Sequence, residues 1–111
     1  MKLSFVTLLL AAGIAAWSQQ AMPRMTSVDP QNGKAGDVLV VTGENLQKDT
    51  VAKVYLTDEK HDFECAITEQ SDTTIKITIP AKATGRLAVM VLAAGKDAKY
   101  IEQPVKVQIY Q

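Results

Sequence analysis

Cysteine, histidine and tryptophan each occur only once in the 111-residue chain, and each scarcity narrows what the protein can be. The single cysteine, Cys65, excludes an internal disulfide, so an exported domain would depend on its hydrophobic core alone. The single histidine, His61, excludes the usual zinc site, which needs several spaced imidazole or thiolate ligands. Acidic and basic residues are balanced at 12 each, so charge would draw the chain neither to nucleic acid nor to an anionic membrane.

Residues 1–18 have the pattern of an export signal peptide, which we expect to form a helix. Lys2 provides the positive start, residues 3–16 form the apolar core, and Ala16-Trp17-Ser18 places small residues at the −3 and −1 positions of a cleavage site. The apolar run is shorter than the ~20 residues that a membrane-spanning helix needs, which favours cleavage over a retained anchor. No cysteine follows the run, so a bacterial lipoprotein anchor has no attachment site.

We therefore expect an exported protein, periplasmic or extracellular, that is not a lipoprotein and keeps no stable membrane anchor after cleavage. Residues 19–23 are expected to form a short linker, and residues 24–111 a single domain. A domain of this size has room for one hydrophobic core.

Apolar residues of the expected domain recur mainly at every second position, in short runs separated by turn residues. This period is typical of half-buried β-strands. The longest helical pattern is one turn at residues 80–83. About seven short strands predict an all-β, immunoglobulin-like sandwich of two sheets. The predicted strands cover residues 25–28, 38–42, 51–56, 63–68, 74–79, 87–92 and 105–109.

Cys65 alternates with Phe63 and Ile67 in the fourth predicted strand. This position predicts a buried, unreactive thiol rather than an intermolecular disulfide or a reactive group. The disulfide and tryptophan of antibody domains are absent, because Trp17 lies in the expected signal peptide.

Turn-forming residues are concentrated in the stretch SVDPQNGKAGDVLVVTGENL, residues 27–46. Gly33 and Gly36 permit the positive φ values that tight turns require. Gly43 and Asn45 are expected to tolerate left-handed φ at the end of the second strand. We expect this chemistry to carry the chain from the first strand across to the other sheet.

The same stretch resembles the IPT/TIG family of immunoglobulin-like domains. VDPQNGKAGDVLVVTGENL contains a Pro-x-x-Gly turn and a strand that closes in Thr-Gly-x-Asn-Leu, and DTTIKITIP and GRLAV follow in the family's order. The resemblance extends from about Pro23 to Ile109 and implies an early-set immunoglobulin sandwich with a role in binding or spacing. Such domains usually lie beside receptors, adhesins or polysaccharide-active enzymes, and members that bind DNA use basic loops, which are not evident here.

The cluster of His61 with Asp58, Glu59 and Asp62 is the strongest candidate for a metal site. We interpret it as a solvated hairpin loop, because one histidine cannot fill a zinc site and the aspartates lack the spaced oxygen ligands of a calcium loop. No serine lies in a nucleophile motif, and no glycine-rich loop precedes a helix. We therefore predict no enzyme activity, no catalytic residue, no cofactor and no metal.

The third, sixth and seventh strands of an immunoglobulin arrangement share one sheet, which the fourth strand can join. If one set of alternate residues points inward, an apolar band with tyrosines covers the outer face, and such bands are typical of contact surfaces. The alternative is that residues 88–92 are apolar because a central strand is well shielded. The candidate partner-contact residues are Tyr55, Ala88, Met90, Leu92 and Tyr110.

The leading hypothesis is an exported, non-catalytic binding or assembly module that contacts another protein in the periplasm or at the cell surface. The alternative is a carbohydrate-recognition module that serves a polysaccharide-active enzyme on another chain. A polysaccharide partner would need an aromatic platform, and the expected domain offers only Tyr55, Phe63, Tyr100 and Tyr110. Nucleic acid is not expected as a partner.

Overall fold

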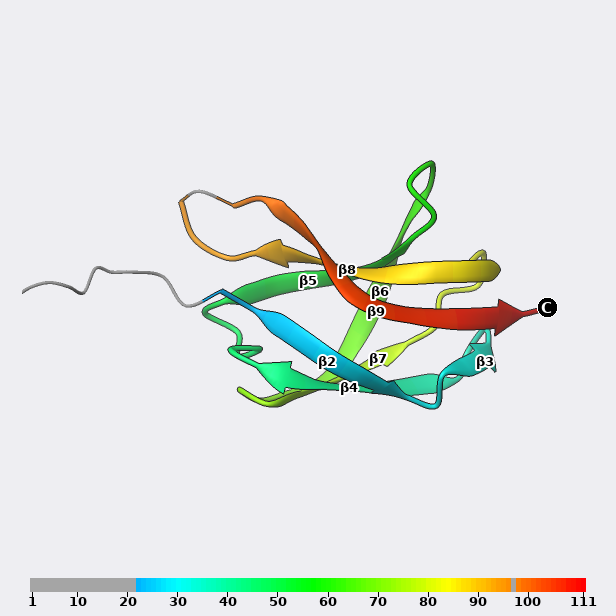
Figure 1. Ribbon diagram of the computed structural model, residues 1–111, viewed down its shortest axis with the longest axis horizontal. Helices are drawn as coiled ribbons and strands as arrows, with labels where there is room; N and C mark the ends of the chain where they lie inside the picture. Colours follow the sequence, from blue (N-terminus) through cyan, green and yellow to red (C-terminus); the bar gives the residue numbers. More distant parts are fainter. Residues whose placement is uncertain (1–21, 97) are drawn as a thin grey trace, which may run out of the picture.

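A computed structural model describes residues 22–96 and 98–111, and within them every regular element is a β-strand (Figure 1). The all-β prediction is therefore confirmed, and no helix in the described part could span a membrane. The expected signal peptide, with most of the linker, lies outside the described residues. The strands are β2 Arg24–Asp29, β3 Asn32–Lys34, β4 Val38–Glu44, β5 Val51–Thr57, β6 Asp62–Gln70, β7 Thr74–Thr78, β8 Gly85–Ala93 and β9 Tyr100–Tyr110.

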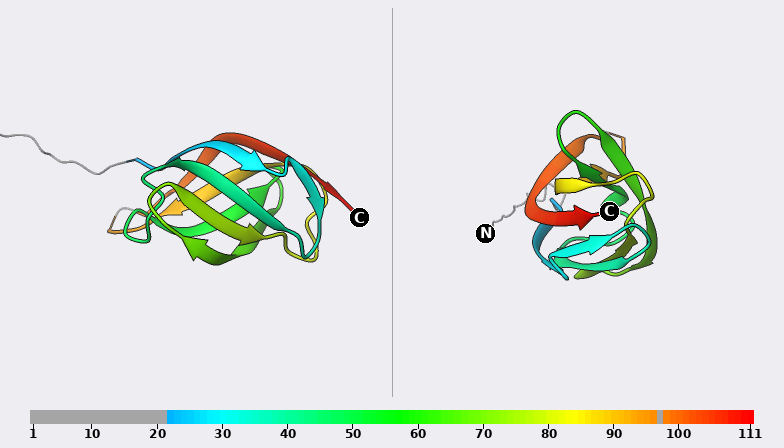
Figure 2. Two further views of the ribbon diagram at one scale, coloured as in Figure 1. Left: turned by 90° about the horizontal axis from the view of Figure 1, so that it is seen from below. Right: turned by 90° about the vertical axis from the view of Figure 1, so that its right-hand side faces the viewer.

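The strands pair in the order β2-β4-β7-β6-β5-β8-β9-β3 and fold into two layers (Figure 2). Strand β6 belongs to both layers, because residues 62–65 pair with β5 and residues 66–70 pair with β7. The sandwich predicted as two sheets is thus one continuous sheet folded over on itself. The prediction that the third, sixth and seventh predicted strands share a layer is confirmed, since β8 lies between β5 and β9.

Most side chains of the core between the layers lie on the strand faces that the period-two alternation predicted to point inward. Phe63 and Ile67 are partly buried and pack against the core. Full burial of one such aliphatic side chain stabilises the fold by about 1.5–3 kcal/mol. The core includes Val54, Leu56, Cys65, Leu87, Val89, Val91, Val105, Val107 and Ile109 from the β5–β6–β8–β9 layer, and Leu39, Val41, Ile75, Ile77 and Ile79 from the opposite layer.

Residues 32–34, expected in a turn, form the short strand β3. It runs parallel to β9, with Asn32 opposite Gln108. The backbone N–H of Gln108 also donates to the carbonyl of Gln31, after a cis peptide bond between Asp29 and Pro30. The expectation that this stretch carries the chain from its first predicted strand to the other sheet is correct only for β3, because β2 and β4 pair with each other in one layer and β3 alone pairs with the other.

The glycines of residues 27–46 meet two different structural requirements, a positive φ at one position and a close backbone approach at another. Gly36 has φ of 92° and Asn45 has φ of 58°, as expected for turn residues. The expectation of positive φ at Gly33 and Gly43 is wrong, because neither is among the positive-φ residues. A Cβ atom at Gly43 would overlap the carbonyl oxygen of Arg24, so β4 needs glycine where the β2 backbone lies against it.

Candidate functional site

The outer face of β5, β8 and β9 brings together four of the five predicted contact residues. The strand register places Tyr55 opposite Met90, with Leu92 and Ala88 on either side of Met90 along β8. Ala88 and Met90 are only 7% and 9% exposed, and Tyr55 and Leu92 are half-buried. The apolar band is therefore narrower than expected, and shielding of the central strand explains the apolar character of Ala88 and Met90.

Tyr110, the fifth predicted residue, lies apart from the other four. Tyr110 pairs with Lys34 of β3. The preceding residue, Ile109, pairs with Gly85, the first residue of β8. A rise of about 3.3 Å per residue places Tyr110 roughly 20 Å along the strands from Met90. Tyr110 is on a neighbouring strand, as predicted, but at the other end of the sheet.

Tyr100, rather than Tyr110, is the tyrosine of β9 that lies near Tyr55, and it pairs with Leu92 of β8. Its ring meets that of Tyr55 edge to face, with 5.6 Å between ring centroids and an interplanar angle of 65°. Tyr100 is 59% exposed, so its ring is open to a ligand. Burial, followed by the nearby Tyr100 side chain, raises the pKa of the Tyr55 hydroxyl. We call these two residues the tyrosine pair.

Tyr100 lies outside the last predicted strand, residues 105–109, because β9 begins five residues earlier, at Tyr100 itself. The alternation nevertheless continues before Pro104, with Gln103 buried and Glu102 exposed. The register between β8 and β9 shifts between Ala88 and Met90, next to Pro104. A proline is tolerated at such an irregularity because no ladder donor is required there.

The same face has a hollow of about 160 Å³ at Thr57 and Ala88, which lie two residues along their strands from Tyr55 and Met90. Ala88 lies between Thr57 and Lys106, and its small side chain leaves room above the sheet. Hydrogen-bonding groups of both charges surround this space, which we call the polar hollow. It is lined by Thr57, Asp58, Glu59, Arg86, Ala88, Glu102 and Lys106.

The candidate metal cluster lies in the β5–β6 hairpin, which projects from the body of the sandwich (Figure 1). Asp58 Oδ1 accepts hydrogen bonds from the backbone N–H groups of His61 at 2.6 Å and Lys60 at 2.9 Å. These bonds, with the His61 side chain, lower the pKa of the Asp58 carboxyl to about 2. No group of three or more His, Cys, Asp or Glu side chains that could hold a metal ion occurs in the described ranges. The two backbone hydrogen bonds to Asp58 close the hairpin turn.

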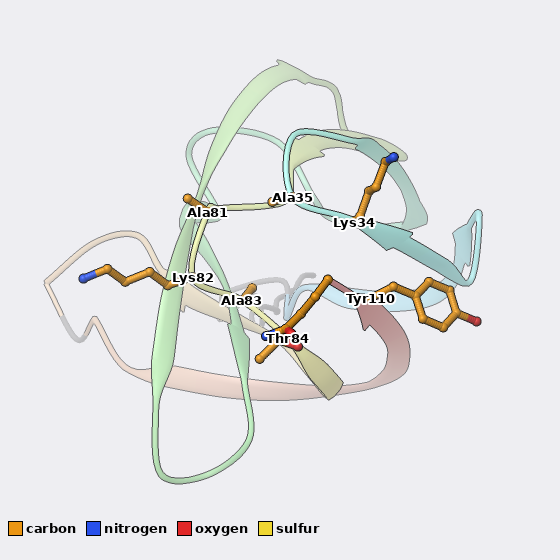
Figure 3. A pocket seen from close by; sticks show the side chains of 8 residues that line it. Lys34, Ala35, Ala81, Lys82, Ala83, Thr84 and Tyr110 are labelled. Carbon is orange, nitrogen blue, oxygen red and sulfur yellow. The ribbon is translucent and has the colours of Figure 1, made fainter.

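A second hollow, of about 570 Å³, opens at the end of the sandwich where Tyr110 lies. It is bounded by the β3–β4 turn, the β7–β8 loop and the end of β9. Figure 3 shows that the side chains of Lys34, Lys82 and Tyr110 point outward at its rim, while short side chains line its wall. We call it the end hollow, and its lining comprises Lys34, Ala35, Ala81, Lys82, Ala83, Thr84, Tyr110 and Gln111.

The known proteins that this chain matches are much longer, and it spans only a small part of each. Cyclomaltodextrin glucanotransferase from Niallia circulans is 37% identical over 80% of the chain, which spans only 13% of that enzyme. A solved protein of unknown function from Bacteroides thetaiotaomicron superimposes with a TM-score of 0.69 at 21% identity, covering 86% of this chain and 24% of that one. An auxiliary nutrient binding protein from Bacteroides ovatus gives 0.60 at 20% identity, over 82% and 21%.

These two solved structures support the fold alone, since their sequences have diverged so far. The family assignment comes from the sequence itself. The sequence model of the IPT/TIG domain family matches residues 23–109. This range includes all the described strands except the last residue of β9. This chain therefore belongs to the IPT/TIG domain family.

Proposed function

We propose that this domain is an exported, non-catalytic binding module that holds a polysaccharide chain on the outer face of β5, β8 and β9. The tyrosine pair beside the polar hollow is the observation that carries this proposal. It also changes the preference between the two hypotheses drawn from the sequence, because two of the four aromatic residues of the domain meet on one face of the sheet. Tyr55 and Tyr100 are in contact, with Tyr100 largely exposed.

A sugar ring presents an apolar C–H face and a rim of hydroxyl groups. The exposed ring of Tyr100 can pack against the C–H face, and its hydroxyl group remains available for hydrogen bonding. Arg86 and Lys106 offer donors in the polar hollow, and Glu102 offers acceptors. A site that combines an apolar platform with a few polar groups is suited to fixing the orientation of such a ligand.

The relationship to cyclomaltodextrin glucanotransferase supports a glucan as the first ligand to test. The chain matches a segment that makes up only 13% of that enzyme, which favours an accessory module over a catalytic unit. The expected signal peptide would deliver the domain to the periplasm or the cell exterior, where polysaccharides occur.

Isothermal titration of the domain with maltoheptaose tests this proposal. We expect Tyr100→Ala to weaken binding about tenfold or more, because loss of an aromatic anchor at a contact site typically costs over 1 kcal/mol. Tyr110→Ala is the matched control, since it removes an equally exposed tyrosine at the other end of the sheet. Unchanged affinity in Tyr100→Ala, or no binding of glucans by the wild-type domain, would contradict the proposal.

A protein partner is the second candidate, favoured by the half-buried Leu92 beside Tyr100. Paired apolar and tyrosine side chains are typical of protein interfaces. A pull-down from envelope extract with the wild-type domain and with Tyr100→Ala separates the two candidates. A protein that depends on Tyr100 for capture, with no glucan binding in titration, would replace the polysaccharide in this role.

A further inference from the structure

The charged side chains of the end hollow are all positive, whereas those of the polar hollow have both signs. Lys34 and Lys82 stand at its rim, and none of the side chains that line it is acidic. The ion pairs among residues 22–96 and 98–111 involve Lys53, His61 and Lys76, so neither rim lysine is paired with a described carboxylate. The positive charge at this end of the sandwich is therefore available to a ligand.

The loops around the end hollow are held together by backbone hydrogen bonds. Gly36 N–H donates to the carbonyl of Ile79 at 2.9 Å, and Ile79 N–H donates to the carbonyl of Asp37 at 2.9 Å. The Asp37 carboxylate also accepts a 3.0 Å hydrogen bond from the backbone N–H of Lys34. These contacts connect the β3–β4 turn to the β7–β8 loop, so the hollow is formed before any ligand arrives.

The wall of the end hollow is suited to a ligand that has an apolar face. Ala35, Ala81 and Ala83 leave the space open because their side chains are short (Figure 3). The Tyr110 ring is 54% exposed at the rim, and Thr84 adds a hydroxyl group. The volume of about 570 Å³ is within the range of roughly 300–1,000 Å³ that is usual for sites of small ligands.

We propose that the end hollow binds a short acidic oligosaccharide, with its carboxylates paired to Lys34 and Lys82 and its sugar C–H face packed against Tyr110. Lysine side chains are flexible, so the two ammonium groups can turn from the outward positions of Figure 3 toward a bound anion. The site is separate from the tyrosine pair and selects for negative charge, so it goes beyond the proposed binding of a glucan.

Tri-galacturonate is a suitable probe, and maltotriose is a neutral ligand of the same length. In ¹H–¹⁵N NMR titrations, we expect tri-galacturonate to shift the amide signals of residues 34–35, 81–84 and 110, and maltotriose to leave them unchanged. The double variant Lys34→Gln/Lys82→Gln should weaken binding about tenfold, because each exposed charge contact contributes up to about 1 kcal/mol. Raising the salt concentration should weaken it further by screening.

The matched control is Lys48→Gln/Lys60→Gln, which removes the same charge from two exposed sites elsewhere. An equal loss of affinity for tri-galacturonate in both double variants would show that net charge alone attracts the ligand, and would contradict the proposed site. Signal changes at Tyr55 and Tyr100, or tighter binding of a hexapeptide of alternating Asp and Glu, would also overturn it. Tyr100→Ala should bind tri-galacturonate normally, so failure of the glucan proposal and failure of this one are distinguishable.

Discussion

Gln103 of β9 bonds to the backbone of Met25 in β2, 78 residues earlier in the chain, with 2.7 Å between Oε1 and the Met25 nitrogen. Its Nε2 donates to the Pro23 carbonyl at 3.5 Å. Strands β2 and β9 lie side by side but are not paired in the sheet order. The Gln103 amide, only 4% exposed, thus satisfies backbone groups that a neighbouring strand would otherwise pair.

Replacing Gln103 by Ala should lower the free energy of unfolding by about 1–3 kcal/mol, because the buried Met25 N–H loses its acceptor. Urea denaturation followed by circular dichroism measures the change. Gln108→Ala, on the outer side of the same strand, should change it by less than about 0.5 kcal/mol. Equal effects of the two variants would show that the Gln103 amide does not hold β2 against β9.

Replacing Gly43 by Ala should destabilise the domain by about 1–3 kcal/mol, because the added methyl group would displace the β2 backbone. Thermal unfolding of this variant should be compared with that of Glu44→Ala, an exposed neighbour on β4. A Gly43→Ala protein as stable as Glu44→Ala would mean that the two backbones are not in close contact.

Cys65 should resist alkylation in the folded protein. It is 4% exposed, and burial raises the pKa of its thiol to about 12, so almost no thiolate forms at pH 8. Iodoacetamide at pH 8 should label it only after urea is added, as read by mass spectrometry. Rapid labelling without denaturant would contradict the buried, unreactive thiol.

Asp58 should titrate with a midpoint near pH 2 in an NMR experiment on the side-chain carboxyl. Because the pKa in the folded state is lower than the unfolded value of about 3.9, its contribution to stability is complete above pH 4. That contribution is lost as the pH falls from 4 toward 2. Asp58→Asn should remove this part of the pH dependence, while Asp72→Asn, in another exposed turn, should keep it.

Met90→Lys should destabilise the domain, whereas Tyr100→Ala should leave its unfolding free energy within about 1 kcal/mol of wild type. Met90 is 9% exposed and Tyr100 59% exposed, so only the first substitution buries a charge. Denaturation curves of both variants check this order of stability. If the order is as expected, Tyr100→Ala is the better variant for binding studies, because weak binding by a Met90→Lys protein could result from unfolding.

The sequence alone determined the inward-facing residues of most strands of this protein. Successive residues of a strand point to opposite faces, and only one face is shielded from water. The burial of Val54 with Leu56, and of Val105 with Val107, could therefore be predicted from their spacing alone. The same reasoning predicted Cys65 as buried and the two-layer architecture. These features depend on neighbours within a few residues, so the local pattern contains them.

The tertiary structure decided where those strands lie along one another, and with that the candidate site. Tyr100 and Tyr55 meet because β8 separates β5 from β9 in a particular register, which the irregularity beside Pro104 sets. The same register moves Tyr110 to the end hollow. Alternation specifies the face of a residue but not its height on the sheet, because every shift by two residues preserves the pattern. Only the packed strands select one of those shifts.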